Sequence, residues 1–196
     1  HGIGKSNLVG QIALGLGSSE EDKGLPIIDR RLAQMTEGDI IGLPELVDGV
    51  TRFAPVDWLL RACREPVVLF LDEINRATVE VQQWAFQLVL DRELNGHKLH
   101  PETRIFCAVN ASPEYQVNEM DPALLDRFWT VDLEPTKEDW VTWASGNGVD
   151  EVMIDFINHY PAHLRHVGQI EPGKIYPTPR SYEKLNKALC LTSWTP

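Results

Sequence analysis

Positive charge is scarce in this chain of 196 residues: 18 lysines and arginines stand against 29 aspartates and glutamates, for a formal net charge of −11. Proteins that bind nucleic acid or anionic membranes broadly need clustered positive charge, so this balance argues against both. A local basic patch, or an anion held by backbone amides, stays compatible with it. Every hydrophobic run falls short of the roughly 18 residues that span a bilayer, so we expect no membrane partner.

Cysteine is also rare. Cys63, Cys107 and Cys190 are too few and too scattered for a disulfide framework or a Cys-x-x-Cys metal site. We therefore expect free thiols, and together with the lack of a visible secretory signal they favour the cytoplasm. Five histidines show no spacing that pairs them with carboxylates, and we expect these side chains to be solvated: His97, His100, His159, His163 and His166.

The chain opens with the letters HGIGKS and continues into an apolar run with helical spacing. Gly-Lys-Ser at a helix start is the second half of a P-loop, Gly-x-x-x-x-Gly-Lys-Ser/Thr. Gly2 and Gly4 would let backbone amides form a phosphate-binding nest, Lys5 would reach the phosphates, and Ser6 would hold Mg²⁺. The alternative is a helix cap beside an ordinary terminus. Because the pattern's first glycine and its preceding strand are missing, we expect an N-terminal truncation.

A buried strand is predicted at 67–71, where five consecutive apolar residues follow Pro66. It ends in Asp72 and Glu73, and ligands bind at this edge of parallel sheets. Four or more hydrophobic residues before Asp-Glu form the Walker B pattern, in which the first carboxylate holds the Mg²⁺ shell and the second polarises the attacking water. Alone, the pattern also fits a strand that merely surfaces at two acids. After a Gly-Lys-Ser helix, it favours an NTPase.

Two further polar residues follow in order. Asn110 comes directly after a second predicted buried strand, 105–109, where an amide can bond both a phosphate oxygen and the attacking water. The alternative is a turn-forming asparagine. An Asp-Pro pair at 121–122 then starts a short helix that ends at Arg127. An arginine there is ordinarily solvated or ion-paired, but in an oligomer it can reach a neighbour's phosphate.

These motifs occur in the order typical of AAA+ ATPases, which the chain resembles over nearly its whole length. The similarity is carried by five segments: 4–6 (GKS), 71–77 (LDEINRA), 109–110 (VN), 121–128 (DPALLDRF) and 179–182 (PRSY). The second and fourth are similar to the MoxR branch in particular. We therefore expect an α/β fold: a P-loop NTPase three-layer αβα sandwich with a mostly parallel sheet, followed by a small helical lid. The core would span 1–134, without its first strand, and the lid 135–196.

The resemblance also implies a role for each matching residue. Nucleotide and cofactor, ATP and Mg²⁺, would be bound by Gly2, Gly4, Lys5, Ser6 and Asp72. Of these residues, Ser6 and Asp72 would ligate the metal. The catalytic set would be Glu73, Asn110 as sensor 1, Arg127 as an arginine finger acting in trans, and Arg180 as sensor 2 on the lid.

The implied function is ATP hydrolysis in a homo-oligomeric, hexameric ring, coupled to remodelling or maturation of a protein partner. In MoxR-like proteins this partner is frequently a von Willebrand factor A-domain protein. Two alternatives stay open: an ATP-gated assembly scaffold with little turnover, and a nucleic-acid motor of the helicase or clamp-loader type. Intact Glu73, Asn110 and Arg127 argue against the scaffold, and the net charge argues against the motor.

Two surface elements complete the prediction. Asn-Gly at 95–96 predicts a two-residue hairpin within 91–100, and 39–46, with Asp-Gly after it, occupies the place of the helix-2 insertion of MoxR-like proteins. By resemblance both tend to face the ring's pore or partner surface; the alternative is a pair of plain surface loops. Helices are predicted at 78–90, from Thr136, at 149–160 and from Pro179, the last with Tyr182, Leu185, Ala188 and Leu189 inward. Residues 129–133 read as strand-like, and 161–177 as an extended connector.

Overall fold

The computed structural model describes residues 2–17, 24–110, 122–166, 168, 171 and 173–192. Contacts divide the chain into two compact units. We call Ser6–Thr130 the core unit; Val131–Pro196 together with His1–Lys5 form the helical unit.

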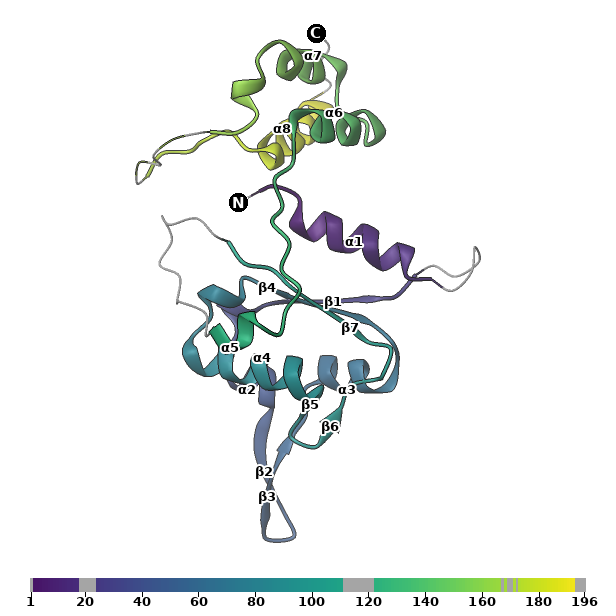
Figure 1. Cartoon of the computed structure of the whole chain (residues 1–196), viewed down its shortest axis with the longest axis vertical. Coiled ribbons are helices and arrows are strands. Elements are labelled where there is room, and N and C mark those ends of the chain that lie inside the picture. Colours follow the sequence, from purple (N-terminus) through teal and green to yellow (C-terminus); the bar gives the residue numbers. More distant parts are fainter. Residues whose placement is uncertain are drawn as a thin grey trace. The chain divides into compact units, whose positions relative to one another are not determined.

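A parallel sheet organises the core unit (Figure 1). It contains β1 (Ile27–Arg31), β4 (Val68–Asp72) and β7 (Arg104–Cys107), with β4 in the centre and both neighbours parallel to it. The register places Leu69 beside Ile28 on one side and beside Ile105 on the other. The central strand is apolar and buried from Val68 to Leu71, as expected for a strand covered on both faces.

Alternate residues of β4 enter two separate cores. Val68 and Phe70 pack with Val9 and Ala13 of α1 (Lys5–Gly15), which covers one face. Leu69 and Leu71 join the larger cluster on the other face, to which α3 (Asp57–Arg64) and α4 (Val79–Asp91) contribute. Figure 1 shows α1 on one side of the sheet and both other helices on the opposite side. The predicted three-layer αβα fold is confirmed.

Two hairpins extend from the core unit. The predicted Asn-Gly hairpin is present as β5 (Glu93–Leu94) and β6 (His97–Lys98). The insertion after α2 (Gly38–Ile41) is a second antiparallel hairpin, β2 (Leu43–Val47) with β3 (Val50–Ala54), where sequence analysis predicted only an insertion or loop. Its turn is the Asp-Gly pair at 48–49, with both residues at positive φ. That pair is a recognised hairpin signal.

The strand-like segment 129–133 is a wrong prediction, because the structure has no strand there. It follows α5 (Pro122–Leu125), and Trp129 and Val131 are exposed. A strand needs a hydrogen-bonded neighbour, and in the described part of the chain none pairs with this segment.

The helical unit contains α6 (Lys137–Gly146), α7 (Glu151–His159) and α8 (Pro179–Leu191), packed around Trp140, Ala144 and Ile157. The predicted capping box of Thr136 and Asp139 is present, and Thr178 caps α8. The predicted inner face of α8 is partly wrong, because Leu185 and Ala188 are exposed.

The buried residue of α8 is Asn186 instead. Its side-chain oxygen accepts a hydrogen bond from the Asp150 amide at 2.9 Å, and its Nδ2 donates to the Gly148 carbonyl at 3.1 Å. These bonds satisfy backbone groups of the loop that leads into α7, so burying this amide costs little. In the described residues, no helix is long and apolar enough to cross a membrane.

Candidate functional site

The two carboxylates of the predicted Walker B motif stand at the C-terminal end of β4. Asp72 is the last residue of the strand, and Glu73 follows with φ 56° and ψ 37°, in the left-handed region. Such a backbone is uncommon for a residue with a side chain. The Asp72 carboxylate supports it, because its Oδ1 accepts a hydrogen bond from the Glu73 amide at 2.9 Å. Backbone strain of this kind concentrates at functional sites.

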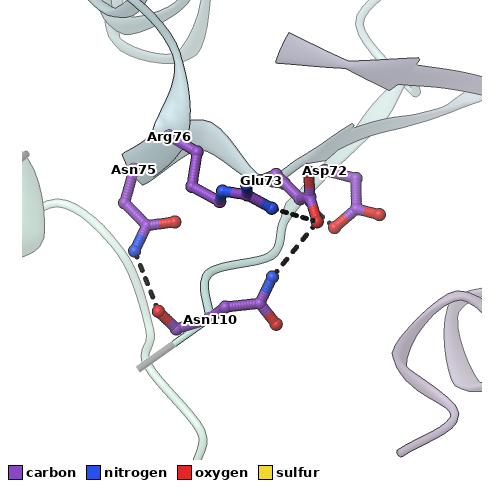
Figure 2. A network of polar contacts seen from close by, with 5 residues as sticks. All are labelled: Asp72, Glu73, Asn75, Arg76 and Asn110. Carbon is purple, nitrogen blue, oxygen red and sulfur yellow. Dashed lines mark hydrogen bonds and ion pairs between the residues drawn. The ribbon is translucent and has the colours of Figure 1, made fainter. Parts of the chain in front are cut away.

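Asn110 meets Glu73 from the neighbouring strand. It follows β7, and its Nδ2 donates a hydrogen bond to Oε1 of Glu73 at 3.3 Å (Figure 2). Asn110 is buried, with 6% of its surface exposed. The parallel topology brings two predicted site residues together although they lie 37 positions apart.

Sequence reasoning missed two residues of this network, Asn75 and Arg76, both in the short 3-10 turn η2 (Ile74–Arg76). Arg76 Nη1 lies 3.3 Å from Oε1 of Glu73, and Asn75 Nδ2 donates to the Asn110 carbonyl at 3.1 Å (Figure 2). Both residues were visible in the motif DEINRA but carried no assigned role. Both residues lie within three positions of Glu73, and this proximity in sequence could have indicated that they contact the site.

Backbone bonds join the same turn to the end of β7. The Ile74 amide donates to the Ala108 carbonyl at 3.3 Å, and the Ala108 amide donates to the Leu71 carbonyl at 3.0 Å. Cys107, the last residue of β7, is a free thiol whose pKa burial raises to about 12, so it stays protonated and unreactive at neutral pH. The backbone bonds tie the turn after Glu73 to the end of β7.

The glycine-rich loop belongs to the helical unit up to Lys5. Gly2 and Gly4 have φ of 71° and 89°, which glycine adopts without strain. Lys5 begins α1, whose first turn has no acidic residue, and Ser6 is exposed. An acid-free helix N-terminus after two left-handed glycines suits an anion.

Arg180 lies beside this loop. It is the second residue of α8, and a Cβ added to Gly2 would stand 3.1 Å from Thr178 Oγ1 and 3.5 Å from the Cβ of Arg180. A side chain at position 2 would therefore press on the start of α8. Within the helical unit, the predicted sensor 2 and the predicted P-loop are neighbours.

The predicted site residues thus form two groups. In the core unit, Asp72, Glu73 and Asn110 are brought together, and Arg127 is exposed after α5. In the helical unit, Gly2 and Arg180 are brought together. Asp121, the predicted cap of the helix before Arg127, lies outside the described residues. Among the described residues, no group of three His, Cys, Asp or Glu side chains is arranged to hold a metal ion.

Comparison with known families identifies the chain. Residues 1–128 match the model of the AAA domain, dynein-related subfamily. The chain belongs to this AAA family. Among solved structures, this AAA chain is similar to Hsp104 in a cryo-EM reconstruction described as its closed state with ATPγS and FITC casein, with a TM-score of 0.62 and 13% sequence identity.

That likeness covers 97% of this AAA chain but 38% of the Hsp104 chain, and at this identity it establishes the fold alone. A search of curated proteins found no match.

Proposed function

We propose that this AAA chain is a MoxR-like ATPase that hydrolyses ATP in a ring and uses the energy to remodel or mature a protein partner. The observation that carries the proposal is the network of Glu73, Asn110 and Asp72 at the end of β4. A carboxylate held there by a neutral amide can accept a proton from a water molecule aligned with the γ-phosphate. Asn110 would contact the same water or a phosphate oxygen.

The nucleotide side of the site would consist of Gly2, Gly4, Lys5 and Ser6. The positive φ of both glycines and the acid-free first turn of α1 support a phosphate cradle. Mg²⁺ would be held by Ser6 and Asp72, whose hydroxyl and carboxylate oxygens are the donors this ion prefers, and it would neutralise phosphate charge.

Arg127 and Arg180, which lie on other elements, would contact the phosphates of the nucleotide. We assign 1–134 to the nucleotide-binding core and 135–196 to a lid, on which Arg180 would sense the γ-phosphate. Its place beside Gly2 supports this role. Arg127, exposed after α5, would reach the phosphates of the next subunit in a hexameric ring. A finger supplied in trans typically contributes ~10³ to 10⁵ in rate, so isolated subunits should hydrolyse ATP slowly.

The proposed partner is a protein, and a von Willebrand factor A-domain protein is our first candidate. Support comes from hairpin β2–β3, where Leu43, Leu46 and Val50 are 69%, 75% and 57% exposed. Exposed apolar side chains gathered on one element mark contact surfaces for other proteins. The net charge of −11 argues against nucleic acid as the partner, and we place the protein in the cytoplasm.

Substituting Glu73 by Gln tests the proposal. The amide preserves shape but cannot accept the proton, so ATP binding should persist while steady-state phosphate release falls by about 10²-fold or more. Glu65→Gln, at an exposed carboxylate of the core unit paired with Arg61, is the matched control and should keep wild-type turnover.

Equal turnover in Glu73→Gln and wild type would remove Glu73 as the base. A wild-type protein that binds ATP and assembles without releasing phosphate would indicate the scaffold instead. Turnover stimulated by DNA would indicate the nucleic-acid motor. Mixing Arg127→Ala subunits with Glu73→Gln subunits should restore some activity if Arg127 acts across the interface, and no restoration at any ratio would contradict a trans finger.

A further inference from the structure

We infer that Arg76 is a positioning residue for the Glu73 carboxylate: with Asn110 it occupies one oxygen, Oε1, and so presents the other oxygen to the attacking water. The inference rests on the proposed ATPase function and assigns to Arg76 a role in the orientation of the base.

Two donors from separate elements converge on the same atom. Arg76 Nη1 from η2 and Asn110 Nδ2 from the end of β7 each lie 3.3 Å from Oε1 of Glu73 (Figure 2). In the described part of the chain, the hydrogen bonds to this carboxylate all end on Oε1. Oε2 is therefore the oxygen available to a water molecule.

One neutral hydrogen bond would not define this orientation. The terminal torsion of a glutamate is broad, so a carboxylate held by Asn110 alone can rotate and exchange its two oxygens. Arg76 adds a charged donor from a second direction. The pair is partly screened from water, since the side chain of Glu73 is 20% exposed and that of Arg76 is 36% exposed.

The backbone conformation places Arg76 close to the Glu73 carboxylate. The Arg76 amide donates to the Glu73 carbonyl at 2.9 Å, which closes the 3-10 turn and places both side chains on one short loop. The left-handed backbone of Glu73 starts that turn. The two side chains therefore start close to each other, and only their own torsions have to be ordered when the ion pair forms.

The test compares Arg76→Ala, Arg76→Lys and wild type in the full-length protein. Phosphate release gives kcat, and titration with a fluorescent ATP analogue gives the nucleotide Kd. We expect Arg76→Ala to lower kcat by about 10- to 100-fold, because a misplaced base loses this much, while Kd changes less than about twofold. Arg76→Lys should recover part of kcat, since an ammonium can still donate to Oε1.

Arg61→Ala is the matched control, because it removes an exposed ion pair of the same unit away from the site and should behave as wild type. If Arg76→Ala does not fold, Arg76→Gln replaces it; its amide can reach toward Oε1 without charge and should give an intermediate kcat. Unchanged or increased kcat in Arg76→Ala would overturn the inference, as would equal losses in the Ala and Lys variants. A wild-type protein without turnover would overturn the proposed ATPase itself.

Discussion

The turn after β4 and the hairpin β2–β3 belong to the same unit but differ in what they bury. The turn encloses polar groups: Asn75 and Asn110 are each 6% exposed. The hairpin does the reverse, and Leu46 at its far end is 75% exposed. Buried amides and exposed leucines both contribute little to a hydrophobic core, so neither feature is explained by stability alone. This opposition supports the proposal that the turn contacts a nucleotide and the hairpin contacts a protein partner.

The register of the hairpin β2–β3 shows which of its side chains lie on the same face. Opposite residues share a face, so Pro44 with Phe53 and Leu46 with Thr51 form one side. No ion pair can form among these four side chains. A two-stranded hairpin is marginally stable by itself, so its conformation depends on how its base is fixed to the core unit.

Gly42 fixes that base, and Gly42→Ala should have the largest effect on stability. This residue has φ 83°, and an added Cβ would overlap the Ala54 carbonyl oxygen. Because this oxygen belongs to the backbone, a change of side-chain rotamer cannot relieve the overlap. Strain and overlap together should destabilise the core unit by about 3 kcal/mol, measured by urea denaturation. Gly49→Ala is the matched control: φ is 78°, but a Cβ there meets nothing within 4 Å, so about 1 kcal/mol is expected. Equal losses in both variants would show that the overlap contributes nothing.

Asn75→Ala should have the next largest effect. The substitution leaves the buried Asn110 carbonyl without its hydrogen bond from Asn75 Nδ2, which costs about 2 kcal/mol of unfolding free energy. Because Asn110 also contacts Glu73, we expect turnover to fall more than nucleotide affinity. Asn147→Ala removes an exposed hydrogen bond at the C-terminal end of α6 and should cost less than about 0.5 kcal/mol. Urea denaturation and phosphate release measure both variants; a stable, fully active Asn75→Ala would contradict a structural role for this amide.

Much of this could be predicted from the sequence because the relevant physics is local or periodic. A strand covered on both faces must be apolar throughout, so the run 67–71 indicated β4, observed as Val68–Asp72. Parallel topology then implied that the residues after β4 and β7 meet at one edge, and Glu73 and Asn110 do.

Contacts that depend on a single backbone angle could not be predicted. The ion pair of Arg76 with Glu73 forms across a turn that begins with a left-handed glutamate, which local propensity disfavours. The hairpin β2–β3 was missed although its Asp-Gly turn was readable, because the segment was assigned by resemblance rather than by its own turn signal. On α8, periodicity favoured Leu185 as inward-facing, but the amide of Asn186 is buried instead because it bonds backbone groups of the loop before α7.

Leu46→Ser should have the smallest effect on the chain itself and thereby isolates the hairpin's role. An exposed side chain loses little contact, so unfolding free energy should change by less than about 0.5 kcal/mol and basal phosphate release should stay at the wild-type rate. Stimulation of turnover by a protein partner should fall severalfold, because the apolar contact is lost. Leu14→Ser on α1 is the matched control, since Leu14 is 68% exposed but lies on another element. If Leu14→Ser weakens partner stimulation as much as Leu46→Ser, exposed leucines act non-specifically and the contrast between turn and hairpin has no functional meaning.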